Sequence, residues 1–301
     1  MIVYHKNQEI DREQWDNCIR NSSCIQPYPY SWYLDIMSPG WEALVDDDYD
    51  SVFPVPSAQR FGIQYVKTPS FVQQLGAFSP DKPIDKAIVE FLYYLPDFYK
   101  LIDLNISQKI DISGFRITER TNRVLDLARP YELIESSFTA HCRRNIETTG
   151  KKGTELVKGI EPDELLDLFI LTKGKELKDI KPRDYQRMRN LMNFCIKNKK
   201  GRILGIRSGR KKLIFGLFLI ETPGCKTIEL MSGTRQAIEK HLDHFSLNEI
   251  IKAHAGSRNC LDFAIHENNG DVSFADSFGA DVRKFYRIYR NRLLVPARIL
   301  R

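Results

Sequence analysis

Two adjacent arginines, Arg143 and Arg144, have the side chains that point most directly to ligand binding. A guanidinium group offers a planar fork of hydrogen-bond donors that matches a phosphate or a carboxylate. The pair therefore predicts either a substrate-binding position or an ion pair with acidic residues earlier in the chain. The sequence leaves both interpretations open.

Charge is unevenly distributed along the 301 residues. Residues 1–130 carry 13 Lys and Arg against 18 Asp and Glu, whereas residues 131–301 carry 32 against 21. A basic C-terminal half favours an anionic partner, such as a nucleotide cofactor, a phosphorylated substrate or RNA; a solvated basic surface explains the excess equally well. The change of sign predicts two domains, residues 1–130 and residues 131–301.

The six cysteines show neither CxxC spacing nor a nearby pair of histidines, so the sequence predicts no zinc site and no other metal. No apolar run reaches the length of a membrane span, and the N-terminus lacks the pattern of a secretory signal. We therefore expect a cytoplasmic protein with reduced cysteines. No residue pattern indicates an oligomeric state.

Several secondary-structure elements must position these groups in the second half of the chain. Apolar spacing and turn residues predict strands at 153–158, 202–207, 213–221, 227–232, 260–265 and 285–290. Helices are predicted at 163–171, after Pro182, at 246–255 and at 272–278. The third of these begins with a capping box formed by Ser246 and Glu249.

The first half repeats this order more loosely. Strands are predicted at 2–4, 41–45, 51–56, 62–66, 72–78, 100–104 and 123–127, and helices at 12–20, 30–37 and 84–95. The sequence thus predicts a tandem of two similar α/β units.

The element order of residues 153–292 resembles the GNAT acyltransferase fold. Five segments also resemble its FemAB-like branch, in which two such domains stand in tandem: Gln73–Phe78, Cys142–Ile146, Phe278–Ala280, Trp32–Asp35 and Pro39–Glu42. The resemblance covers most of the chain and implies an α/β fold (α+β mixed sheet) with two tandem GNAT-like domains, the acyl-CoA N-acyltransferase fold. It implies an acyl-donor site in residues 131–301 and a substrate-shaping role for residues 1–130.

In GNAT enzymes the acyl-CoA enters between the fourth and fifth strands. Its pyrophosphate lies on amides of the loop and helix after the fourth strand, where exposed N–H groups and the helix dipole favour an anion. The resemblance places these strands at 227–232 and 260–265, and acyl-CoA is the expected co-substrate. It implies cofactor binding by six residues: Met231, Ser232, Gly233, Arg235, His244 and Ser246.

Two residues at this cleft are candidates for catalytic proton transfer. Glu229, on the fourth strand, would act as a base through water. His266 follows the fifth strand at the mouth of the cleft, where loop residues often carry function. A solvent-facing strand residue and a solvated turn are the simpler interpretations of these two positions.

Three departures from the family pattern keep other functions open. The loop 233–245 contains one glycine, the helix at 272–278 contains no tyrosine, and Ala275 stands where tRNA-dependent Fem enzymes have a lysine. The leading hypothesis is an N-acyltransferase acting on a small-molecule or peptide-like amine. The alternatives are a transferase that uses aminoacyl-tRNA and acts on a cell-wall precursor, with tRNA as its partner, and a catalytically silent GNAT-fold binding protein.

Overall fold

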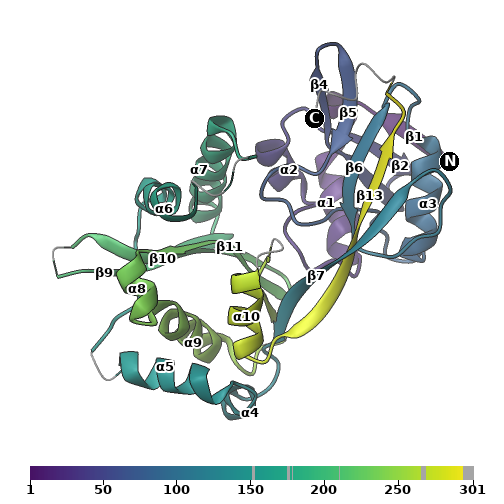
Figure 1. The fold of residues 1–301 in the computed structure, drawn as a ribbon. Helices are drawn as coiled ribbons and strands as arrows, with labels where there is room; N and C mark the ends of the chain where they lie inside the picture. Colours follow the sequence, from purple (N-terminus) through teal and green to yellow (C-terminus); the bar gives the residue numbers. More distant parts are fainter. Residues whose placement is uncertain (151–152, 175–176, 178, 210, 266–268, 294–301) are drawn as a thin grey trace. The chain divides into compact units, whose positions relative to one another are not determined.

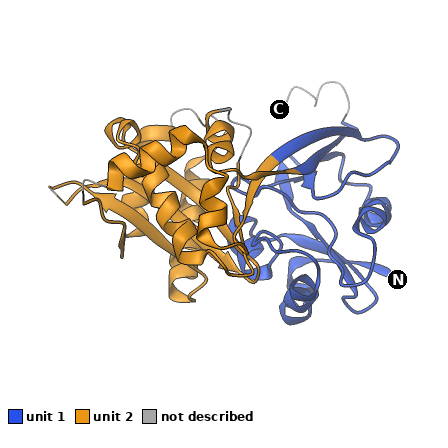
Figure 2. Cartoon of the chain, turned by 90° about the horizontal axis from the view of Figure 1, so that it is seen from below, with its two compact units in different colours: residues 1–121, 284–301 blue, residues 122–283 orange. Residues whose placement is uncertain are grey.

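The computed structural model describes residues 1–150, 153–174, 177, 179–209, 211–265 and 269–293. The chain divides into two compact units, which Figure 2 colours separately. Unit 1 consists of Met1–Thr121 and Lys284–Arg301, and unit 2 consists of Asn122–Arg283. This division differs from the boundary predicted at residue 130, because each unit includes a strand from the other half of the sequence.

In the strands and helices of unit 1, the spacing of the apolar residues determines which face of each element is buried. Its elements are β1 (Ile2–His5), the 3-10 helix η1 (Asn7–Glu9), α1 (Arg12–Asn21), α2 (Ser31–Met37), β2 (Glu42–Asp46), β3 (Ser51–Val55), β4 (Ser57–Arg60), β5 (Ile63–Lys67), α3 (Ile84–Tyr94), β6 (Leu101–Ile106), the start of β7 (Arg116–Asp126) and most of β13 (Asp281–Asn291). Helix α1, for example, is capped by Asp11 and buries Trp15, Cys18 and Ile19, which share one helical face.

Two sheets form in unit 1. Strands β1, β2 and β3 form an antiparallel sheet, and β4, β5, β6 and β13 form a second group in that order, with a parallel pair at β5 and β6. The prediction of a strand at 72–78 is wrong, since this segment forms only isolated bridges at Leu75 and Phe78. Its apolar residues are buried, but the φ of +129° at Gly76 interrupts the extended backbone.

Unit 2 is built around one mixed sheet. Its elements are the end of β7, α4 (Tyr131–Ser136), α5 (Ala140–Gly150), β8 (Val157–Lys158), α6 (Pro162–Phe169), the π-helix η2 (Ile170–Gly174), α7 (Pro182–Lys197), β9 (Gly201–Arg207), β10 (Leu213–Thr222), β11 (Cys225–Gly233), α8 (Arg235–Glu239), α9 (Leu242–His254), β12 (Cys260–Asp262), α10 (Asn269–Ser277) and the start of β13. The strand order is β7-β12-β11-β10-β9-β8, and only β11 and β12 are parallel neighbours.

Helices cover both faces of the unit 2 sheet (Figure 1). On one face α6, η2 and α7 contact β9, β10 and β11; on the other, α5 packs on α9, and α8 lies beside both α9 and β11. The central strand β10 is consequently buried on both sides, which explains its near-continuous apolar run. The predicted mixed α/β fold is confirmed for this part of the chain.

Three predicted boundaries in unit 2 are wrong. The strand predicted at 153–158 is reduced to Val157–Lys158, and the strand predicted at 260–265 ends at Asp262. The predicted capping box at Ser246 does not begin a helix, because α9 already starts at Leu242 and buries Ser246 in its second turn. A capping-box pattern is local, and the tertiary packing of Phe245 and Leu247 in the core extends the helix toward its N-terminus.

His254 lies in the last turn of α9, with its Nε2 atom 2.8 Å from Nη2 of Arg202 on β9. A guanidinium group only donates hydrogen bonds, so Nε2 must accept and the imidazole must be neutral. Burial, together with the positive charges of Lys226 and Arg202, lowers the pKa of His254 below its ordinary value of 6.5. The folded state therefore favours the neutral ring.

We predict that His254 makes the protein less stable in acid. The unfolded chain binds a proton at this ring more readily than the folded protein does, so stability is complete above about pH 6.5 and is lost as the pH falls below that value. The free energy of unfolding, measured by urea denaturation from about pH 7 to about pH 5, should fall more steeply for the wild type than for His254→Gln. Equal slopes for the two proteins would contradict the assignment.

Candidate functional site

The parallel strands β11 and β12 pair over only a short distance. Their described register consists of Cys225 with Cys260, Lys226 with Leu261 and Thr227 with Asp262. Strand β11 then continues to Gly233, whereas β12 ends at Asp262. Residues 228–233 of β11 therefore lie beyond the described pairing with β12, and alternate peptide groups of this segment point away from β10. No described strand pairs with this edge, which is therefore a position where a ligand can accept backbone hydrogen bonds.

Hydrogen bonds toward β7 explain why β12 ends early. The side-chain Nδ2 of Asn122 donates to the Asp262 carboxylate at 2.7 Å, and the side-chain Oδ1 of Asn122 accepts from the Ile265 N–H at 3.1 Å. Asp262 also accepts from the N–H of Ala264, whose φ of +46° turns the chain out of the extended conformation. The segment after β12 is thus held on the β7 side, and the edge of β11 is left open.

Glu229 is the extra residue of a β-bulge in β11. Phe218 of β10 pairs with Leu230, and the next residue, Leu219, pairs with Ile228, so Glu229 has no residue opposite it. A bulge bends a strand and increases its twist, which increases the separation of β11 from β12 beyond Thr227. Glu229 is only 8% exposed. Burial and, to a smaller extent, the negative charge of Glu229 raise the pKa of the Cys195 thiol on α7 to about 12, so the Glu229 carboxylate lies on the sheet face covered by α7.

The π-helix η2 contributes two polar side chains at the same end of β11. The Thr172 hydroxyl lies 2.5 Å from the Ser232 hydroxyl, and Lys173 donates to Asp271 of α10 at 3.2 Å. Turns of π-helix are rare and occur frequently at functional sites. Thr172, Lys173 and Asp271 were not predicted as site residues, because a π-helix has no recognisable signal in sequence and Asp271 is distant from η2 along the chain.

The structure brings together four of the predicted residues on β11: Glu229, Met231, Ser232 and Gly233. Met231 packs partly buried against the core on the α9 side, and Ser232 faces η2. Gly233 is packed so closely that an added Cβ would lie 3.0 Å from the side chains of Ile238 and Phe215. His266 lies outside the described residues.

Arg235, His244 and Ser246 do not join the open edge of β11. Arg235 is an exposed residue of α8 that forms an ion pair with Glu239. His244 is packed against the rings of Phe274 and Phe278, and the Ser246 side chain is completely buried within α9. Arg235 thus forms an ion pair at the surface, whereas His244 and Ser246 pack in the core.

Arg143 and Arg144 are exposed residues of α5. The Arg143 guanidinium donates to the backbone carbonyls of Phe138 and Glu135, so it ties the start of α5 to the preceding helix. The side chain of Arg144 makes no ion pair with a described residue. Neither arginine has an acidic partner in the described part of unit 2, and the Arg144 guanidinium, unlike that of Arg143, makes no hydrogen bond to backbone carbonyls there.

The N-terminus of α9 does not fit the diphosphate of a bound coenzyme A. Its first turn already contains the buried carboxylate of Asp243, whose Oδ1 accepts from the His244 N–H at 2.8 Å and lies 2.9 Å from His244 Nδ1. This carboxylate uses the positive end of the helix dipole and would repel a second anion. The short helix α8, inserted between β11 and α9, further separates this terminus from the open strand edge along the chain.

Among the described residues, no group of three or more His, Cys, Asp or Glu side chains is placed to hold a metal ion. None of the described helices combines the length and apolar character needed to cross a bilayer.

No protein-family model matches the sequence, and no curated protein matches it either. Solved structures, in contrast, match almost the whole chain. FemX aligns with a TM-score of 0.64 at 11% identity over 98% of each chain, and L-PGS from Bacillus licheniformis with 0.56 at 15% over 96% of this chain and 95% of that chain. A tandem GNAT protein from the clavulanic acid biosynthesis pathway gives 0.50 at 11% identity, over 96% and 98%.

The fold is of the tandem GNAT type. This confirms the fold class and the FemAB-like resemblance predicted from the sequence. At identities of 10–15% the likeness concerns the fold and leaves the chemistry to the residues of this chain. The open edge of β11 and the bulge at Glu229 are the features of unit 2 that bear on such chemistry.

We predict that Asn122→Ala lowers the free energy of unfolding by about 1–3 kcal/mol. The substitution removes the donor to the buried Asp262 carboxylate and the acceptor for the Ile265 N–H. Urea denaturation measures the change, with Asn190→Ala on the exposed face of α7 as a control expected to stay within about 0.5 kcal/mol of the wild type. A variant as stable as the control would show that this contact does not hold the strands in place.

Proposed function

We propose that the protein is an N-acyltransferase whose reaction centre is the open edge of β11. The observation that supports the proposal is the strand edge at residues 228–233, which lies beyond the pairing with β12 and carries a bulge at Glu229. Backbone N–H groups on such an edge can bind an acyl carbonyl oxygen and stabilise the negative charge that develops on it. Binding by backbone N–H groups needs no particular side chain, so it does not require the family motifs that this sequence lacks.

The reaction requires an amine, an activated acyl group and a route for one proton. The amine nitrogen attacks the carbonyl carbon, forming the C–N bond, and the C–S or C–O bond to the leaving group then breaks. Glu229 would accept the proton lost by the attacking amine, directly or through one water molecule, and that proton would then pass, directly or through the same water, to the leaving thiolate or alkoxide. Ser232 and Thr172 would orient the acceptor from the η2 side of the strand.

The acceptor in this proposal is a small-molecule or peptide-like amine. Acyl-CoA is the proposed donor, with its acyl end at β11. No step is assigned to its diphosphate, because Asp243 occupies the helix terminus where that group was expected. Arg143 and Arg144 stay candidates for substrate binding, since their guanidinium groups are exposed and without an acidic partner in the described part of unit 2.

An aminoacyl-tRNA donor is the second candidate. Two observations favour it: the misfit of a diphosphate at α9, and the likeness to FemX over almost the whole chain. An ester-linked donor would place its carbonyl on the same strand edge, so the chemistry at Glu229 is common to both donors. A GNAT-fold protein that binds a ligand without transferring an acyl group is the third possibility to be separated by experiment.

We predict that Glu229→Gln lowers kcat by about 10²-fold, with a smaller effect on the KM for the donor, because the amide retains the shape of the side chain but cannot accept the proton. Release of free thiol from acyl-CoA, in the presence of a panel of primary amines, measures the rate. Glu249→Gln, on the exposed surface of α9, is the matched control and should retain wild-type activity. An unchanged kcat in Glu229→Gln would remove this residue from the mechanism.

Calorimetric titration decides among the donors. Binding of acetyl-CoA or a longer acyl-CoA below about 1 mM supports the leading proposal, and absence of binding at that concentration overturns it. Salt-sensitive retention of charged tRNA, with transfer of the amino acid to an amine, would then establish the second candidate. Failure with both donors would leave a binding protein.

A further inference from the structure

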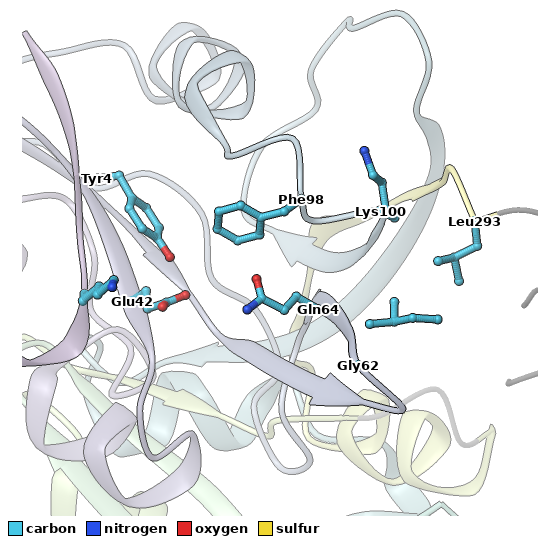
Figure 3. A pocket seen from close by; sticks show the side chains of 9 residues that line it. Tyr4, Glu42, Gly62, Gln64, Phe98, Lys100 and Leu293 are labelled. Atoms are coloured by element: carbon cyan, nitrogen blue, oxygen red, sulfur yellow. The ribbon is translucent and has the colours of Figure 1, made fainter.

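Unit 1 contains a cavity of about 610 Å³ that the proposed acyl transfer does not use. Its wall is formed by β1, β2, the start of β5, the segment before β6 and the segment after β13 (Figure 3). The lining residues are Tyr4, Lys6, Glu42, Gly62, Ile63, Gln64, Phe98, Lys100 and Leu293. The volume lies within the usual range for small-molecule sites, and the wall combines aromatic, aliphatic and charged groups.

Glu42 is a half-buried carboxylate at one side of this cavity. The Tyr99 hydroxyl donates to its Oε2 atom, and the Tyr4 hydroxyl lies 3.1 Å from that of Tyr99. Burial raises the pKa of Tyr4 to about 12 and raises that of Tyr99 further, so both hydroxyls stay protonated and hold the carboxylate as an acceptor. No Lys, Arg or His in the described part of the chain lies within ion-pair distance of Glu42. The Glu42 carboxylate thus forms no ion pair with a described residue, and Lys6, which follows the β1 residue that pairs with Ala43, is a second cation of the lining on this side.

Two aromatic rings lie beside this carboxylate. Tyr4 and Phe98 meet edge to face with their ring centroids 6.4 Å apart, and Figure 3 shows both side chains projecting toward the cavity. Phe98 is 48% exposed, although a ring of this size is usually buried. An ammonium group is attracted to the face of an aromatic ring and to a carboxylate, and the two attractions act on the same position here.

Positive charge lies at the other side of the cavity. Figure 3 shows Lys100 beyond Phe98, on the side away from Glu42, with Gln64 between them. Lys100 is exposed and forms no ion pair with a described residue, so its ammonium group is available to an anion. The apolar side chains of Ile63 and Leu293 complete the wall. The lining therefore has the Glu42 carboxylate at one side, the Phe98 ring and the Gln64 amide in the middle, and the Lys100 ammonium at the other.

We propose that this cavity binds a zwitterion whose two charges are separated by a short apolar segment, such as a short peptide or an ω-amino acid. The ligand's ammonium group lies against Glu42 and the rings of Tyr4 and Phe98, and its carboxylate lies at Lys100. A free α-amino acid fits less well, because its two charges are attached to the same carbon atom. The site lies wholly in unit 1, and the inference stands whether or not unit 2 transfers acyl groups.

Three probes of matched length test the two ends of the site separately. ε-Aminocaproate carries both charges, hexylamine carries only the ammonium and hexanoate only the carboxylate. Titration of the full-length protein, followed by NMR chemical shifts, gives the three dissociation constants. We expect ε-aminocaproate to bind at least about 10-fold more tightly than either single-charge probe, since it makes both charged contacts. Equal affinities for all three probes would overturn the proposal.

Two variants assign the contacts. Glu42→Gln should weaken ε-aminocaproate and hexylamine by about 10-fold and leave hexanoate unchanged, whereas Lys100→Met should weaken ε-aminocaproate and hexanoate and leave hexylamine unchanged. Glu90→Gln and Lys86→Met, both exposed on α3 and outside the cavity, are the matched controls and should bind like the wild type.

A thermal melt of each variant distinguishes a lost contact from a lost fold, and Lys100→Met, altered at an exposed position, tests the carboxylate end even if Glu42→Gln unfolds. Loss of all three probes in a folded variant, or loss of none, contradicts the arrangement.

Discussion

The hydrogen bond between Asn122 and Asp262 is the interaction on which unit 2's candidate site depends. Both side chains are almost completely buried, and the bond holds the end of β12 on the β7 side of the sheet. A parallel neighbour would otherwise continue along β11 and satisfy its peptide groups. Because β12 ends at Asp262 instead, no described strand pairs with this edge of β11 beyond Thr227. An edge of this kind costs stability unless water or a ligand satisfies it, which makes it a natural position for binding.

The candidate site of unit 2 lies where regular structure is interrupted. The bulge at Glu229 breaks the β10–β11 register, the π-helix η2 breaks the helical register after α6, and the turn at Ala264 ends β12. Each interruption turns a polar side chain or peptide group away from its usual partner. The regular elements around them, above all β10 with helices on both faces, provide the rigid packing that holds these irregular positions in place.

The two units present different kinds of binding surface. In the proposed reaction, backbone groups along the β11 edge of unit 2 recognise a carbonyl group with little dependence on residue identity. Unit 1 offers a cavity whose selectivity comes from side chains, with Glu42 and Lys100 at opposite sides. The sequence indicated an acidic first half but not this site, because Tyr4, Glu42, Phe98 and Lys100 are distant along the chain and only strand pairing brings them to one wall.

Local patterns in the sequence determined most of the elements. Periodic apolar residues predicted α1, α6, α7 and the strands β9, β10 and β11 within one to three residues, and their order predicted the GNAT-type fold. Local patterns failed where a distant contact decides the outcome. The capping box at Ser246 was overridden by core packing of α9, the strand after Cys260 was shortened by Asn122, and Asp243 took the helix terminus expected for a diphosphate.

The identity of Glu229 was visible in the sequence, but its position on a bulge was not, since register is a property of two strands together. Pairing between strands also determines the division into units. The end of β7 pairs with β12, and β13 pairs with β6, so the boundary follows strand pairing and not sequence order. Apolar periodicity determines which residues are buried. Hydrogen-bond partners far apart along the chain decide where a strand ends, and thus where its edge is left open to a ligand.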